Sequence, residues 1–137
     1  MTSWALISVI IQATIAFAAV AQGSNSQISE PRHVVVRTAD EWQALWKLHS
    51  TNAPPSVDFS KSMVVGVFLG TRPTAGYGVR IVNVRGTGDA IVVDYREQKP
   101  APGGMTAQML TSPFQLVSIP RDNRKVEFSE LKNQTGG

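Results

Sequence analysis

The sequence predicts an α+β fold, with a mainly antiparallel β sheet or sandwich and one amphipathic helix packed on it. Residues 63–69 (MVVGVFL) form an apolar run rich in β-branched side chains, which is typical of a strand covered on both faces. Apolar and polar residues alternate along residues 90–98, as in a strand with one exposed face. Four residues recur at the spacing of one helix face: Trp42, Leu45, Trp46 and His49.

The chain begins with an apolar block that predicts export. Its first 29 residues carry no charged side chain, and the block ends in Ala19-Val20-Ala21, the A-x-A pattern of a signal-peptidase site. We therefore predict a cleaved signal peptide over residues 1–21 and a periplasmic or extracellular protein. The alternative is an uncleaved membrane anchor, but polar residues interrupt the block and it is shorter than the ~20 apolar residues of a membrane span. No stable membrane span is expected after cleavage.

The rest of the chain predicts one domain. Residues 22–31 are mostly small and polar and predict a flexible leader, residues 32–129 form the domain, and residues 130–137 predict a disordered tail. The chain contains no cysteine, which excludes a disulfide framework and a lipid anchor on cysteine. Its net charge of +3 is mild and the basic residues are scattered, so nucleic-acid binding is not expected.

The first elements of the domain are a short strand at residues 33–37 and a helix at residues 39–50. Thr38 and Glu41 have the spacing of a capping box, which predicts the helix start. Two prolines at 54 and 55 predict that the helix has ended before them. The two indoles on its apolar face would each contribute about 2 to 3 kcal/mol when buried, so this helix must lie on the sheet.

Residues 63–81 predict a central hairpin, in which a buried strand, a turn and a second strand follow one another. Pro73 fixes its own φ, whereas Gly70 and Gly76 allow dihedrals that other residues avoid, so we expect a stiff exposed turn. Further along, a turn at 86–89 joins strands at 79–85 and 90–98, a loop follows at 99–104, and short strands are predicted at 114–119 and 126–128.

The segment from Arg72 to Tyr77 is the first candidate recognition loop. Arg72 offers a rigid fork of donors to carboxylates or carbonyls, and Tyr77 supplies amphipathic contact area. In the alternative interpretation the segment is a structural turn, with Tyr77 folded onto the sheet and Arg72 bound to a backbone carbonyl. Residues 102–109 are the second candidate loop. Their two methionines could form an adaptable contact surface or pack inside, and we favour packing.

Two stretches of the chain, VVGVFLGTRPTAGYGVRIVNV and YREQKPAPGGMTAQMLTSPFQLVSIP, resemble the C-terminal domain of the PrcB family, named for a subunit of a bacterial surface protease complex. The resemblance runs from about His33 to Phe128, and its most specific motifs are GTRPTAGY and PGGM. It implies an exported β-rich domain that accompanies or stabilises a protease. The candidate partner-binding residues are Arg72, Pro73, Thr74, Gly76, Tyr77, Pro102, Gly103, Gly104 and Met105.

The RPTAGY segment is also similar to the NPTTGY loop of chagasin-type inhibitors of cysteine proteases, in which this loop and a Gly-rich loop enter the active-site cleft. Pro102-Gly103-Gly104 weakly resembles the second element. Arg72 stands where that family has Asn, Ala75 replaces the second Thr, and the Arg-Pro-Trp element is absent. Direct protease inhibition is therefore the second hypothesis, and binding of an envelope ligand is the third.

The sequence offers no catalytic constellation. Its two histidines, His33 and His49, lack the HxxxH and HExxH spacings of metal sites, and His49 is expected to pack or to act at the helix C-terminus. No nucleophile, base and metal combination stands out. We therefore expect a non-enzymatic protein without a cofactor or a metal.

Overall fold

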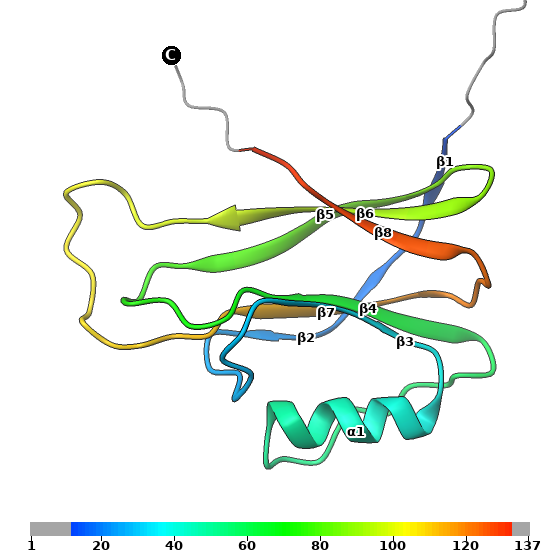
Figure 1. Ribbon diagram of the computed structural model, residues 1–137, viewed down its shortest axis with the longest axis horizontal. Coiled ribbons are helices and arrows are strands. Elements are labelled where there is room, and N and C mark those ends of the chain that lie inside the picture. The colour runs from blue at the N-terminus through cyan, green and yellow to red at the C-terminus, as the bar shows by residue number, and fades with distance from the viewer. Residues whose placement is uncertain (1–11, 133–137) are drawn as a thin grey trace, which may run out of the picture.

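The computed structural model describes residues 12–132 as two four-stranded sheets that face one another, with one helix outside the second sheet (Figure 1). This confirms the predicted α+β sandwich. The first sheet has the order β1 (Ala13–Ile15), β5 (Gly78–Gly86), β6 (Ala90–Gln98) and β8 (Lys125–Glu130). The second has the order β2 (Ala18–Gly23), β7 (Phe114–Pro120), β4 (Ser62–Phe68) and β3 (Arg32–Val36).

Strand β4 lies at the centre of the molecule and is buried on both faces, as the apolar run predicts. Met63, Val65 and Val67 face the first sheet and join the core between the sheets. Val64 and Phe68 face the other way, into a second apolar cluster under the helix. One strand therefore contributes to both cores.

The predicted hairpin of residues 63–81 is wrong, because β4 and β5 belong to different sheets. β4 pairs with β3 and β7, and β5 pairs with β1 and β6, all antiparallel. Residues 69–77 instead cross from one sheet to the other, starting with a turn at Gly70, whose φ of 80° favours glycine. The second sheet satisfies both edges of β4, which leaves no place there for β5.

Helix α1 (Ala39–His49) begins as predicted at Thr38, whose hydroxyl accepts a hydrogen bond from the Glu41 amide at 3.1 Å. Trp42 and Trp46 lie on the second sheet, and their indole N–H groups donate to the carbonyl oxygens of Pro55 at 3.0 Å and Asn52 at 2.7 Å. The chain after the helix therefore folds back and satisfies both indoles, which lets them be buried at little polar cost.

Strand β6 is more buried than its alternating sequence predicts. It lies between β5 and β8, and its first six residues are buried on both faces. Asp94 is only 4% exposed because Asn83 and Arg85 on β5 donate to its carboxylate, each at 2.9 Å. The carboxylate of Asp94 is therefore covered by side chains of the neighbouring strand, whereas Arg96, further along the same face, is exposed.

The N-terminal segment differs from the predicted flexible leader at residues 22–31. Gln22 and Gly23 belong to β2, and Ile28 is buried in the cluster under the helix. The backbone is held as well, because Ser112 donates its amide to the Ser24 carbonyl at 2.6 Å. Of the predicted signal peptide, residues 1–11 lie outside the described residues, whereas residues 13–15 and 18–21 form β1 and most of β2.

The predicted tail at 130–137 also begins inside the fold. Glu130 is the last residue of β8, and the Leu131 amide donates to the Tyr95 carbonyl at 2.7 Å. Residues 133–137 lie outside the described residues. Strand β8 runs parallel to β6, the one parallel pairing between the described strands.

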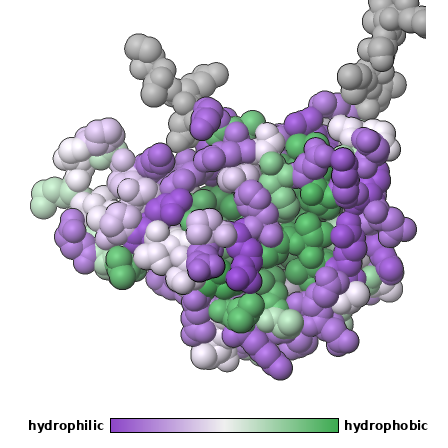
Figure 2. Space-filling model, in the orientation of Figure 1, coloured by the Kyte–Doolittle hydropathy of each residue, from purple (hydrophilic) through white to green (hydrophobic). Residues whose placement is uncertain are grey.

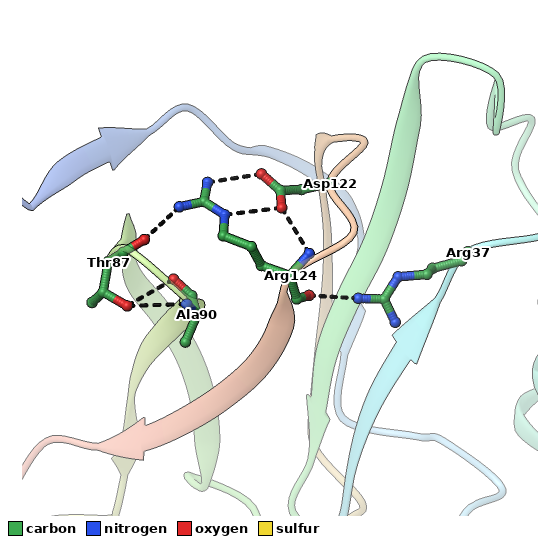
Figure 3. Close-up of polar contacts among 5 residues, drawn as sticks. All are labelled: Arg37, Thr87, Ala90, Asp122 and Arg124. Carbon is green, nitrogen blue, oxygen red and sulfur yellow. Dashed lines mark hydrogen bonds and ion pairs between the residues drawn. The ribbon is translucent and has the colours of Figure 1, made fainter.

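A polar cluster ties together several segments near the turn between β5 and β6 (Figure 3). Arg124 donates to the Thr87 carbonyl at 2.6 Å and to both carboxylate oxygens of Asp122, at 3.0 and 2.8 Å. Arg37, just after β3, donates to the Arg124 carbonyl at 2.8 Å. These bonds to Arg124 lower the pKa of Asp122 to about 2.

Candidate functional site

The two loops that the sequence singles out lie side by side at one end of the sandwich (Figure 1). We call residues 69–77 the crossover loop and residues 99–113 the long loop. Arg72 and Thr111 exchange backbone hydrogen bonds of 2.7 and 3.0 Å, and the Ala75 amide donates to the Ala107 carbonyl at 3.1 Å. The two loops therefore form one joint surface, although residues 78–98 separate them in sequence.

Arg72 is bound within the protein. Its Nε and Nη2 donate to the two carboxylate oxygens of Glu97 on β6 at 3.0 and 3.2 Å, and its Nη1 donates to the Leu69 carbonyl at 3.0 Å. The hydrogen bond with Glu97 raises the pKa of Arg72. Its side chain is 25% exposed. The bond to the Leu69 carbonyl agrees with the interpretation in which Arg72 binds a backbone carbonyl and stabilises a turn. The sequence did not indicate the second partner, Glu97.

The ring of Tyr77 also contacts the Arg72 guanidinium. It is partly buried, and the Arg72 guanidinium carbon lies 6.0 Å from the centre of its ring, within range of a cation–π contact. Pro73 and Gly76 are exposed, and Thr74 is partly buried and accepts a hydrogen bond on its carbonyl from the Thr111 hydroxyl at 3.0 Å. The exposed residues of the crossover loop are therefore Thr71, Pro73 and Gly76.

Gly76 brings the two loops into close contact. Its φ is 93°, and a side chain there would meet Pro100 at 2.9 Å and Thr106 at 3.3 Å. Glycine is thus required both by the backbone conformation and by the closeness of the long loop.

The long loop exposes its apolar side chains, so the predicted packing of its methionines is wrong. Met105 is 103% exposed, Met109 52% and Leu110 72%. The turn at Gly103 explains this: its φ is 77°, and no atom lies within 4 Å of a side chain added there, so the loop turns away from the sheets. Pro102 and Gly104 are exposed too. In Figure 2 this loop is the lobe at the left, with isolated hydrophobic side chains among polar ones.

Methionine and leucine side chains exposed in this way are suited to contact with another protein. Methionine is unbranched and polarisable, so it adapts to irregular apolar surfaces. The loop carries three exposed apolar side chains within six residues, and an apolar surface that is exposed contiguously marks interaction sites. The spacing of the residues gave no sign of this, because exposure depends on the turn at Gly103.

A second apolar feature, which the sequence analysis missed, lies along the open side between β3 and β8, where Figure 2 shows a hydrophobic strip. His33 on β3 stacks on Phe128 of β8 with ring centres 4.5 Å apart, and its Nε2 lies 3.1 Å from the Tyr95 hydroxyl. Burial lowers the pKa of His33, while Glu130 acts in the opposite sense. This histidine joins the two sheets.

His49 packs in the core, as predicted. It is 5% exposed, its Nδ1 lies 2.7 Å from the Ser26 hydroxyl, and its ring meets the edges of Trp46 and Phe114. Burial lowers its pKa, which outweighs the preference of a helix C-terminus for a cation. Within residues 12–132, no group of three His, Asp or Glu side chains has an arrangement that could hold a metal ion.

Both candidate loops lie in the part of the chain that matches a known protein family. Residues 63–120, from β4 to β7, match the family model described as PrcB C-terminal. This match supports membership of the PrcB C-terminal family over this segment. The matched segment contains both loops completely, and the family implies association with a protease complex. Searches of curated proteins and of solved structures returned no match. No helix within the described residues is long and apolar enough to cross a bilayer.

Proposed function

We propose that this chain is an exported, non-enzymatic protein-binding domain that acts as an accessory or stabilising subunit of an extracytoplasmic protease. The observation that carries the proposal is the exposed apolar group of Met105, Met109 and Leu110 on the long loop. The PrcB C-terminal match supplies the class of partner. Export rests on the apolar block and the Ala19-Val20-Ala21 pattern.

The geometry gives the two loops different roles in this proposal. The crossover loop holds the long loop through backbone hydrogen bonds, while Arg72 anchors it to β6. The long loop then presents its apolar side chains from a fixed base, which limits the entropy lost on binding to the loop tip. We expect Arg72 to act through the position of the loops and Met105 to contact the partner.

A pull-down with the full chain, tagged at its C-terminus and expressed in its native cell, tests this proposal. The test variant is Met105→Ser/Met109→Ser/Leu110→Ser. The matched control is Leu48→Ser, because Leu48 is 55% exposed on the helix, away from both loops. We expect a protease to be retained by the wild type and by the control and to be lost from the triple variant. Retention by the triple variant would exclude the long loop as the contact, and a wild type that retains no protease would overturn the proposal.

Direct inhibition is a second candidate, supported by the exposed residues Pro73 and Gly103 on two loops that are hydrogen-bonded to one another. The two functions differ in a simple assay of peptide hydrolysis by the captured protease. An accessory subunit changes the abundance or the stability of the protease and leaves turnover intact. An inhibitor lowers hydrolysis when added at a stoichiometric concentration, and the same triple variant and a Pro73→Ser/Thr74→Ser variant show which loop is responsible.

A further inference from the structure

The outer face of the first sheet carries two arginines directly opposite one another, which we call the arginine pair. In the antiparallel pairing of β5 with β6, Arg80 lies opposite Arg96, and both residues are exposed. Their neighbours Ile81 and Tyr95 are buried in the core between the sheets, so the arginines point outward. Like charges in directly opposite positions destabilise a sheet. We therefore expect the arginine pair to weaken the sheet rather than to hold it together.

No carboxylate within residues 12–132 neutralises the arginine pair. Glu97, the next residue on β6, accepts from Arg72 through both of its oxygens. Asp94, on the same face as the pair, accepts from Arg85. The side chains of the arginine pair form no hydrogen bond or ion pair with any described residue. Two permanent charges therefore face outward without a counter-charge from the protein.

The arginine pair lines a shallow cleft of about 340 Å³, whose walls are Arg80, Val82, Arg96, Glu97, Gln98 and Lys99. Val82 lies at the bulge between β5 and β6 and is 39% exposed, so it adds an apolar surface. Lys99 is exposed and adds a third cation. It is also the first residue of the long loop, which β6 enters at this end (Figure 1).

The chemistry of the cleft suits carboxylates on a short peptide. Guanidinium groups bind carboxylates through two parallel hydrogen bonds, and Val82 can contact an apolar side chain beside them. The free positive charge does not continue along the sheet, because Arg85 is paired with Asp94 and Lys125 with Glu127. Nucleic acids and anionic membranes select for longer basic surfaces. A second copy that met this face with its own would bring like charges together.

We propose that this cleft binds an acidic segment of a partner protein, with the arginine pair holding its carboxylates and Lys99 adding to the attraction. The inference rests on the proposed function and deepens it, because it gives the partner an acidic segment beside the apolar surface that meets the long loop. Lys99 belongs to both the cleft and the long loop, so one partner can reach both. Binding between such exposed charges weakens as the salt concentration rises.

Fluorescence anisotropy of a labelled synthetic peptide, GEVEVG, added to the full chain tests the cleft. We expect this peptide to bind and the uncharged peptide GQVQVG not to bind. Arg80→Gln/Arg96→Gln should weaken binding about tenfold or more, and Arg80→Lys/Arg96→Lys should also weaken it, because an ammonium lacks the planar fork. The matched control Arg32→Gln/Lys47→Gln removes the same charge from exposed positions on β3 and α1 and should bind as the wild type does. Circular dichroism checks that each variant is folded.

Three results of the titration would overturn the inference: equal binding of the two peptides, equal weakening by the control variant, or no binding of the acidic peptide at about millimolar concentration. Tighter binding of single-stranded DNA or of phosphatidylserine vesicles would overturn the choice of a protein segment. In the pull-down, a protease captured equally by the wild type and by Arg80→Gln/Arg96→Gln overturns the inference and leaves the proposed function standing. A wild type that captures no protease overturns the proposed function, and the peptide titration is read separately from it.

Discussion

Arg72 and Glu97 form a two-pronged ion pair that joins the crossover loop to β6. The Nε and Nη2 groups of Arg72 meet the two carboxylate oxygens of Glu97 at 3.0 and 3.2 Å, with side chains only 25% and 12% exposed. Such a planar pair fixes direction as well as distance. It therefore orients the backbone of the crossover loop, and through it the long loop.

We expect Arg72→Ala to lower the free energy of unfolding by about 1 to 3 kcal/mol, since it leaves the partly buried Glu97 and the Leu69 carbonyl without this donor. Arg72→Lys should recover little, because an ammonium cannot reproduce the fork. Urea titration measures both. Arg80→Ala is the matched control, as Arg80 is exposed on β5, and should change stability by less than about 0.5 kcal/mol. Equal effects of the two alanine variants would contradict the anchoring role.

Gly66 on β4 should tolerate no side chain. A Cβ there would collide with the Leu116 side chain and lie 2.8 Å from the Gln115 carbonyl oxygen, in the tightly packed middle of the second sheet. We expect Gly66→Ala to destabilise by about 1 to 3 kcal/mol through overpacking. Gly88→Ala is the control, because no atom lies within 4 Å of its added Cβ. Thermal unfolding of the two variants checks this, and an unchanged Tm for Gly66→Ala would show that β7 can shift.

Both histidines should make the fold less stable in mild acid. Burial lowers the pKa of His49, and of His33, below the usual 6.5, so the unfolded chain takes up protons before the native state does. Stability is therefore complete above about 6.5 and falls as the pH drops below it. His49→Gln should flatten this dependence while lowering stability at neutral pH, because the bond to Ser26 is altered. Chemical denaturation between about pH 7 and pH 5 measures the slope, and an identical slope in the variant would refute the assignment.

Asp122 should make stability depend on pH in a more acidic range than the histidines do. Its pKa of about 2 lies below the usual 3.8, so its contribution is present above 3.8 and is lost as the pH falls toward 2. We expect Asp122→Asn to lower stability at neutral pH and to remove this part of the acid dependence. Glu127→Gln serves as the control, since the Lys125–Glu127 pair has side chains more than half exposed and should contribute less than about 1 kcal/mol. Acid titration followed by circular dichroism distinguishes the two.

Local patterns in the sequence predicted the helix and the strands from β3 to β8, but they predicted neither the strand partners nor the strands β1 and β2. The apolar run of β4 requires cover on both faces, and the spacing of Trp42 and Trp46 requires a helix packed on a sheet. Neither pattern states which strand lies beside which. The hairpin prediction failed because β4 and β5 were taken as neighbours in the sheet, whereas β4 pairs with the preceding strand β3 and with the distant strand β7.

The sequence singled out two loops that lie together, but it did not predict which of their side chains are exposed. The GTRPTAGY and PGGM motifs pointed to two loops that do lie together. Arg72 was a candidate contact residue in one interpretation and a structural residue in the other; its guanidinium is held by Glu97, 25 positions away, and no local pattern reports such a partner. Met105 and Met109 were expected to pack, yet the turn at Gly103 directs them outward. Exposure is a property of the assembled loop and is not encoded by residue type.

The pairing of β2 with β7 places Ala18 opposite Ser118, so the two partners are separated by nearly the whole chain. β4 likewise pairs with a strand made much later, because Ser62 lies opposite Pro120 on β7. Folding controlled by such distant contacts is slow, since long loops must close before any bond forms. A chain emerging from the ribosome thus keeps its most apolar strand without a sheet partner on the β7 side until residue 120 has been made. The second sheet is therefore completed only when translation has nearly reached the end of the chain.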